Sequence, residues 1–231
     1  MSWFGKYIKS SIGAKHLMAI SGLMLIGFVL IHMLGNLQMF SGQAAVNAYA
    51  VQLKSLGGLL WIARGGLILA VLVHIISAVR LVMMNSAARP VKYKMVKSDK
   101  SSFASRTMKW GGIIVVLFIG FHLVQLTLGG GGGEFAENYN RLDQYGRHDV
   151  YNMTVLGFQN VIVSSAYIVA MLALCLHLSH GVTSLFQSLG LNHPKYNGMI
   201  KMAGPAIATL VLIGNCSMPI AVLAGWVKAT V

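Results

Sequence analysis

The chain has 231 residues, of which 56% are hydrophobic and 10% are charged, and its mean hydropathy is +0.68. This composition excludes an ordinary water-soluble domain and indicates a protein that crosses a membrane several times. The formal net charge is +13, but most of the lysines and arginines lie in three segments before or between apolar runs. Membrane topology explains that distribution, so we expect no nucleic-acid partner.

Five apolar segments have about the 20 residues that a helix needs to cross a bilayer. They lie at about 17–40, 59–84, 108–128, 157–189 and 203–226. The first run lacks a signal-peptidase site and is long enough to span, so we expect it to stay uncleaved. The spans predict an all-α membrane protein with a single transmembrane domain over residues 1–231 and five transmembrane helices.

The segments between the spans predict the orientation. The most basic of them, 85–109, contains Arg89, Lys92, Lys94, Lys97, Lys100, Arg106 and Lys109 against Asp99. Lysine and arginine are enriched in cytoplasmic loops, so this segment and the N-terminus are predicted to be cytoplasmic. Segments 41–58 and 129–156 are then outward loops, and the C-terminus is outside.

Four histidines lie deep inside the first four spans, at His32, His74, His122 and His177. Ionisable residues at such depth are costly and are usually functional, and imidazole is a common axial ligand of haem iron. The orientation puts His32 and His122 in the outer half and His74 and His177 in the inner half. Pairing by depth predicts a four-helix bundle core enclosing two stacked bis-histidine b haems.

Other histidines are weaker candidates for haem ligands. His180 follows His177 by three residues on nearly the same helix face, so spacing alone leaves either as the ligand. His16, at the cytoplasmic edge, His148, in the outer loop, and His193, at a turn, are expected to be solvated surface residues.

Small and polar residues near the histidines have two interpretations each. Glycines flank the sites at Gly27, Gly35, Gly120 and Gly181, where either a porphyrin or a neighbouring helix could approach closely. Asn36 and Gln38 are candidates for hydrogen bonds to a quinone, with helix capping as the alternative. Arg64 and Arg106 are candidates for haem propionate bonds, with snorkelling and topology as the alternatives.

The two cysteines, Cys175 and Cys216, lie in apolar runs and are expected to behave as buried small hydrophobes. No CxxC or CxxCH motif occurs, which excludes covalently attached c-type haem.

The spans carry several local sequences with a recognisable pattern: SSIGAKHLMAISGLML, LIHMLGNLQMF, GLILAVLVHI, ASRTMKW, GFHLVQ and LHLSHGVTSLFQSLG. With them, essentially the whole chain resembles the di-haem cytochrome b membrane-anchor subunit of succinate:quinone oxidoreductases, the succinate dehydrogenase and fumarate reductase family. In the fourth helix of that family the ligand precedes one glycine by four residues and another by thirteen. His177 fits this pattern with Gly181 and Gly190, whereas His180 does not, so the resemblance favours His177.

The resemblance implies a function. The subunit would lie in a bacterial cytoplasmic (inner) membrane as a multi-pass protein and anchor a flavoprotein and an iron–sulfur protein on the cytoplasmic face. Electrons would pass between those subunits, which hold FAD and the iron–sulfur clusters, and a membrane quinone through the two haems. The inner haem would face the iron–sulfur subunit, and the outer haem would lie near the quinone site. We expect the quinone to be menaquinone.

One position departs from the family. Some members carry a glutamate two residues before the histidine of the fourth span, where this chain has Cys175. None of the five spans contains aspartate or glutamate, so we expect no acid-based proton path through the bundle.

Two alternatives stay open. One is the cytochrome b subunit of another quinone-linked enzyme, such as a hydrogenase or formate dehydrogenase. The other is a haem-free transporter whose histidines relay protons, although a relay is expected to include carboxylates and the spans contain none.

Overall fold

The computed structural model describes residues 2–88, 101–130 and 134–230. Within these residues the chain is helical, apart from turns and one isolated bridge between Leu142 and His148. The long helices are α2 (Ser11–Asn36), α4 (Gly58–Ala87), α5 (Phe103–Leu126), α8 (Val161–Ser188) and α9 (Asn197–Leu223). The short helices are α1 (Trp3–Lys9), the 3-10 helix η1 (Leu37–Ser41), α3 (Gln43–Ser55), α6 (Glu134–Asn138) and α7 (Val150–Gln159).

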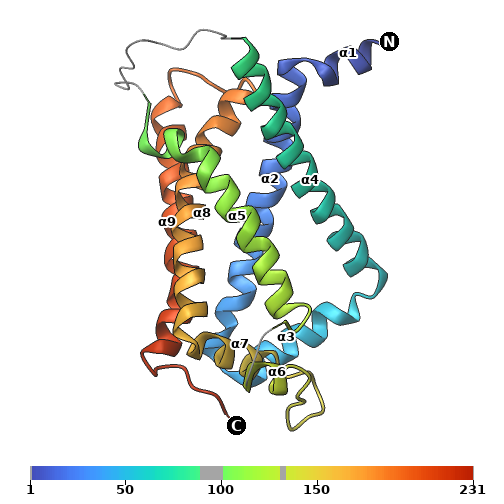
Figure 1. Ribbon diagram of the computed structural model, residues 1–231, viewed down its shortest axis with the longest axis vertical. Coiled ribbons are helices and arrows are strands. Elements are labelled where there is room, and N and C mark those ends of the chain that lie inside the picture. Colours follow the sequence, from blue (N-terminus) through green and yellow to red (C-terminus); the bar gives the residue numbers. More distant parts are fainter. Residues whose placement is uncertain (1, 89–100, 131–133, 231) are drawn as a thin grey trace.

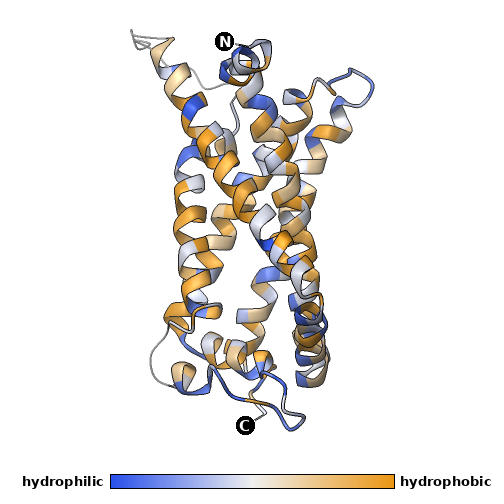
Figure 2. Ribbon diagram, turned by 90° about the vertical axis from the view of Figure 1, so that its right-hand side faces the viewer, coloured by the Kyte–Doolittle hydropathy of each residue, from blue (hydrophilic) through white to orange (hydrophobic). Residues whose placement is uncertain are grey.

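The prediction of five membrane spans is confirmed, because five described helices are long and apolar enough to cross a membrane. They run along the long axis of the molecule (Figure 1). Hydrophobic residues colour most of their length, and hydrophilic residues gather toward the two ends (Figure 2).

Capping residues explain where the helices begin and end. The Ser10 hydroxyl accepts a hydrogen bond from the Gly13 amide, so α2 begins at residue 11 rather than near 17. Asn160 caps α8 and separates it from α7, which divides the span predicted at 157–189. At the other end of α8, Gly190 adopts φ +72° and stops the helix.

The fifth span also begins earlier than predicted. The apolar pattern predicts a start near residue 203, but α9 starts at Asn197 and Pro205 lies inside the helix. The apolar pattern marked only the membrane-crossing part and missed the polar turns that precede it.

The closest packing joins α8 and α9. Ala208 and Val211 of α9 are almost fully buried in a cluster with Met33 of α2 and Leu178 of α8. α5 packs on the opposite side of α8, and α2 lies against α4, α8 and α9. This arrangement brings the first four long helices together around a common interior, with α9 supporting α8 from outside.

Three short helices close one end of the bundle. α3, α6 and α7 lie beside the C-terminus at the end opposite α1 (Figure 1). The sequence predicted loops at 41–58 and 129–156, so these helices correct that expectation. Both segments are too short or too polar to span, yet their helices are stabilised by contacts with one another.

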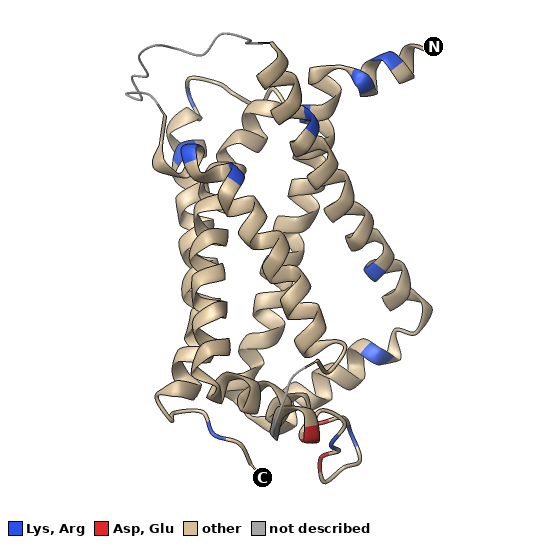
Figure 3. Cartoon of the chain, viewed as in Figure 1, with Lys and Arg blue, Asp and Glu red and all other residues tan. Residues whose placement is uncertain are grey.

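Charge is distributed unequally between the two ends. The acidic side chains lie at the α3/α7 end (Figure 3), and the described residues place Glu137, Asp143 and Asp149 there. The α1 end carries Lys6, Lys9, Lys15, Arg80, Arg106, Lys109, Lys195 and Lys201. Arg89, Lys92, Lys94, Lys97, Lys100 and Asp99, on which the predicted orientation also rests, lie outside the described residues.

We predict that Gly204→Ala weakens the α8–α9 contact. A Cβ atom at Gly204 would overlap the backbone carbonyl oxygen of Ser179 and lie 2.7 Å from the Thr183 Oγ1. Because backbone cannot swing aside, we expect a loss of about 1–3 kcal/mol in the free energy of unfolding. Thermal unfolding in detergent measures it, with Gly120→Ala as the control because nothing lies within 4 Å of a Cβ there. Equal melting temperatures for the two variants would contradict the prediction.

Candidate functional site

The four deep histidines meet as two pairs inside the bundle. The ring centroids of His32 on α2 and His122 on α5 are 5.8 Å apart, with an interplanar angle of 89°. Those of His74 on α4 and His177 on α8 are 6.2 Å apart, with an angle of 60°. The structure therefore brings together the two members of each pair that we expected from the depth of the histidines in the spans.

The spacing of the rings suits a metal ion between them. An imidazole nitrogen binds a transition metal at about 2 Å, so two rings on opposite sides of one ion have centroids about 6 Å apart. In the described part of the chain, no group of three or more His, Cys, Asp or Glu side chains could hold a metal ion. Two nitrogen donors alone fit an iron that brings its remaining ligands with it, as haem iron does.

Hydrogen bonds fix the tautomer of His122. The Tyr167 hydroxyl donates to Gln125 Oε1 at 2.9 Å, so its oxygen is left to accept from His122 Nδ1–H at 3.1 Å. With the proton on Nδ1, the Nε2 lone pair is available to a metal. Tyr167 and Gln125 are both buried, which shields these bonds from competing solvent.

His74 has the same kind of support. Its Nδ1 lies 3.2 Å from the Met18 backbone carbonyl oxygen, which can only accept, so Nδ1 carries the proton. The Ser21 hydroxyl, 3.3 Å from Nδ1, itself donates to the Leu17 carbonyl oxygen and is a further acceptor for the ring. The Nε2 lone pair of His74 is therefore also available to a ligand.

The two remaining rings are held by packing. His32 stacks on Phe28 one turn earlier in α2, with centroids 5.1 Å apart and an interplanar angle of 17°. His177 Nδ1 is buried and has no hydrogen-bond partner. Leaving a buried polar atom without a hydrogen bond costs about 1–3 kcal/mol. A ligand bound at the other ring nitrogen would offset this cost.

Glycines open space beside the His74–His177 pair. A Cβ atom at Gly22 of α2 would lie 3.2 Å from His74 Cε1, and one at Gly112 of α5 would lie 3.6 Å from His177 Cε1. Each of these glycines precedes the histidine of the other pair on its own helix, His32 or His122, by ten residues. We did not predict the role of these two glycines, although the repeated interval is visible in the sequence and could have indicated it.

The flanking glycines chosen from the sequence have different surroundings. A Cβ at Gly35 would lie 2.7 Å from the Tyr49 ring, so this glycine allows α3 to pack on α2. Nothing lies within 4 Å of a Cβ at Gly27 or Gly120, and Gly181 faces Met108.

The two pairs lie at different levels of the bundle. Tyr167 contacts His122, and His177 follows Tyr167 on α8 by ten residues. The same interval separates Gly112 from His122 on α5 and Gly22 from His32 on α2. At 1.5 Å per residue the levels are about 15 Å apart along the axis. His74 and His177 form the level nearer the α1 end, which carries most of the described lysines and arginines and is called the cation-rich end below.

The structure shows the surroundings of the weaker candidates from the sequence. Asn36 is exposed at the end of α2, and Gln38 is partly buried in η1. The Arg64 guanidinium lies 5.0 Å from the centre of the Trp61 ring, and Arg106 donates to the Ser101 carbonyl oxygen at 2.7 Å. His180 is partly buried on α8.

The other three histidines lie near the ends of the bundle. His16 bonds the Tyr7 hydroxyl, and His193 is exposed. His148 differs from expectation, because its ring is partly buried beside Tyr139 and Nδ1 has no partner. Burial and nearby Lys54 lower the pKa of His148.

An apolar groove runs along the outside of the bundle beside the His32–His122 pair. It has a volume of about 280 Å³ and lies between α5 and α8. Its lining includes Phe118, whose ring centroid is 5.8 Å from that of His122. Phe118 therefore lines the groove and also contacts the His122 ring.

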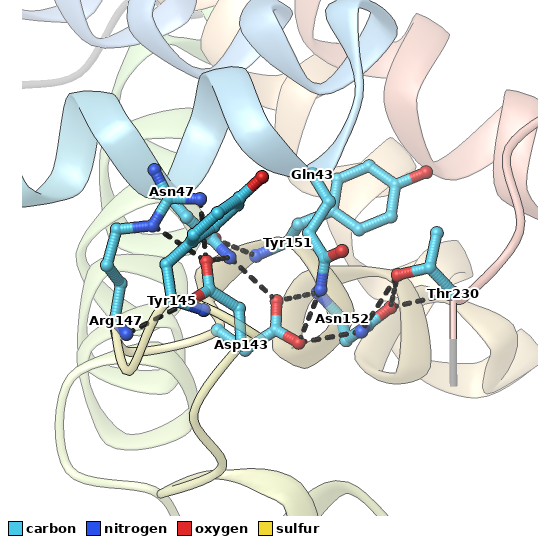
Figure 4. A network of polar contacts seen from close by, with 9 residues as sticks. Gln43, Asn47, Asp143, Tyr145, Arg147, Tyr151, Asn152 and Thr230 are labelled. Atoms are coloured by element: carbon cyan, nitrogen blue, oxygen red, sulfur yellow. Dashed lines mark hydrogen bonds and ion pairs between the residues drawn. The ribbon is translucent and has the colours of Figure 1, made fainter.

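A polar network that we did not predict from the sequence holds the α3/α7 end together (Figure 4). Asn47 of α3 is fully buried, and its amide nitrogen donates to both Asp143 and Asp149 at 3.0 Å. Its oxygen accepts from the Tyr151 amide at 3.1 Å. Asp149 also accepts from the side chains of Gln43 at 2.8 Å and Asn152 at 2.7 Å.

Asp143 is the charged centre of the loop in this network. It pairs with Arg147 at 2.8 Å and accepts a bond from the Tyr145 amide. Desolvation acts to raise the pKa of Asp143, but the bonds from Arg147, Asn47 and Tyr145 outweigh it and hold that pKa well below its usual range. The stability given by the ionised form is thus present above the ordinary pKa of about 3.9 and is lost as the pH falls below it.

The network reaches the histidines through the apolar core. Tyr151 and Val155 of α7 belong to one buried cluster with Phe158, Tyr167 and Met218. Tyr167 is the residue that bonds His122. The closed end of the bundle therefore supports the position of the His122 ring.

Comparisons with protein-family models, curated proteins and solved structures find no match for this chain.

We predict that Asn47→Ala loosens the α3/α7 end. The buried Asp149 loses a donor and the buried Tyr151 amide loses its acceptor, so the free energy of unfolding should fall by about 1–3 kcal/mol. Thermal unfolding and faster amide hydrogen exchange in α7 measure the effect. Gln52→Ala, an exposed change on the same helix, is the control. Unchanged exchange in α7 for Asn47→Ala would show that the network is not needed.

Proposed function

We propose that this chain is a membrane cytochrome b that holds two bis-histidine b haems, one between His32 and His122 and one between His74 and His177. The observation that carries the proposal is the pair of facing imidazoles at each of two levels, with ring separations of 5.8 and 6.2 Å. The hydrogen bonds that leave Nε2 free on His74 and His122 support it.

The chain's own residues would position and insulate these groups. Each haem supplies a one-electron carrier when it is bound. Tyr167 holds the His122 ring, and the Met18 carbonyl holds the His74 ring, so that neither rotates away from its partner. Gly22 and Gly112 leave room for the two rings at the His74–His177 level.

Within this class we propose the anchor subunit of a succinate:quinone oxidoreductase in a bacterial cytoplasmic membrane. The support is the sequence resemblance, together with the level of His74 and His177 near the cation-rich end, where the flavoprotein and iron–sulfur subunits would dock. The chain would transfer electrons between the iron–sulfur subunit and quinone and would have no succinate site of its own. An orientation with the N-terminus in the cytoplasm follows from the same distribution of charge.

The quinone would react near the opposite end. The apolar groove beside Phe118 leads toward the His32–His122 pair and supports this assignment. Asn36 and Gln38, four and six residues after His32, are the proposed candidates for bonds to its carbonyl groups, and menaquinone is the proposed type.

We predict that the purified chain contains two b haems and that four alanine variants each lose one. His32→Ala and His122→Ala should lose the same haem, and His74→Ala and His177→Ala should lose the other. A pyridine haemochrome assay with redox titration distinguishes the two. His180→Ala is the matched control and should keep both haems.

Three outcomes would oppose the proposal. A wild-type chain without haem would favour a haem-free transporter, and loss of haem in His180→Ala but not in His177→Ala would overturn the choice of ligand. Copurification with the catalytic subunit of a hydrogenase or formate dehydrogenase, and not with a flavoprotein that oxidises succinate, would keep the cytochrome but reject the complex.

We predict that Tyr167→Phe raises the midpoint potential of the haem between His32 and His122. Without the bond to Nδ1, the imidazole is a weaker donor and stabilises ferric iron less. If the imidazole's preference for ferric over ferrous iron falls tenfold, the midpoint potential rises by about 59 mV for one electron. Tyr151→Phe is the control, because Tyr151 is buried in the same cluster but its hydroxyl bonds the Lys228 carbonyl oxygen. An unchanged potential in Tyr167→Phe would show that the bond has no effect on the haem.

A further inference from the structure

A groove lies between α1 and α4 at the cation-rich end of the bundle. Its volume is about 630 Å³, and it is lined by Ile8, Lys9, Arg80, Met83 and Met84. Three apolar side chains thus share one open surface with two cationic ones. Neither the histidine pairs nor the proposed electron transfer uses this groove.

Arg80 is held in a fixed position there. Its guanidinium donates to the backbone carbonyl oxygens of Ile8 at 3.1 Å and Lys9 at 3.0 Å, which are at the C-terminal end of α1. These bonds use two of the five N–H groups of the side chain. The remaining donors are available to an anion.

The groove has no neutralising acidic residue in the described part of the chain. The described carboxylates lie at the opposite end (Figure 3), and the ion pair among them joins Arg147 to Asp143. Lys9, in the last turn of α1, is exposed. The groove therefore combines apolar walls with a net positive charge.

The position of the groove corresponds to the boundary between hydrocarbon and headgroups. Arg80 lies seven residues before the end of α4, about 10 Å along the helix. Beside it, α1 exposes Trp3 and Phe4 and carries Lys6 and Lys9, which is typical of a helix that lies in the membrane interface.

We propose that this groove binds an anionic phospholipid. The phosphate would be held by Arg80 and Lys9, and an acyl chain would lie along Ile8, Met83 and Met84. Charge complementarity selects the anionic headgroup, since basic pockets beside membrane helices bind such lipids. The apolar walls select a lipid over free phosphate, because phosphate has no acyl chain to cover them.

The experiment uses the full chain in detergent, with phosphatidylglycerol or phosphatidylcholine added and the bound lipid counted by native mass spectrometry. We expect phosphatidylglycerol to be retained in preference to phosphatidylcholine, and Lys9→Gln to lower its retention about fivefold. Met83→Glu should lower it at least as much by adding a negative charge to the wall, while the bonds of Arg80 to α1 stay intact.

Met202→Glu is the matched control. Met202 lies near the start of α9 at the same end, and its exposed fraction of 66% is close to the 65% of Met83. Retention should be unchanged in this variant. Equal loss in Met202→Glu and Met83→Glu would overturn the proposal in favour of general surface charge. Equal retention of the two lipids, or competition by glycerol 3-phosphate as strong as by phosphatidylglycerol, would also overturn it.

Discussion

An imidazole inside a membrane-spanning helix needs a bonding partner for each of its two ring nitrogens, because hydrocarbon offers neither a hydrogen-bond donor nor an acceptor. In His74 and His122, one nitrogen is bonded to a carbonyl or hydroxyl oxygen and the other is left toward the interior of the bundle. The long helices are arranged so that each such ring meets a second ring from another helix. Electron transfer is the function that we propose for this costly arrangement of paired histidines.

Support for the rings comes from parts of the chain that contribute no histidine. α9 buries Ala208 and Val211 against its neighbours and holds α8 in place. At the α3/α7 end, Asn47 joins two carboxylates, and the apolar cluster above them includes Tyr167. A change far from the histidine pairs can therefore alter the orientation of His122.

The spans were predictable because their signals are local. An apolar run of sufficient length and a histidine within it can both be recognised without knowing what lies beside them. The pairing of His32 and His122 by depth needed only the direction of each span. The start of α9 was placed too late because its first turns have no continuous apolar pattern.

The closed end could not be predicted in the same way. Asn47 and Asp149 are separated by 102 residues, and each looks like an ordinary loop residue until the two segments meet. The same is true of Gly22, whose close neighbour is His74 on the next long helix. Contacts between segments that are distant in the sequence decide which polar residues are buried. These contacts cannot be inferred from the local pattern of a single sequence.

The ten-residue interval between the levels has a geometric consequence. Ten residues of α-helix turn through almost three full rotations and fall short by about 80°. Gly22 of α2 therefore faces α4 while His32 faces α5, and Gly112 of α5 faces α8 while His122 faces α2. The two levels are therefore linked, because α2 and α5 each contact one neighbouring helix at the first level and a different one at the second. An inserted residue between the levels would turn one of them by about 100° relative to the other, so the length of this interval is as constrained as the histidines themselves.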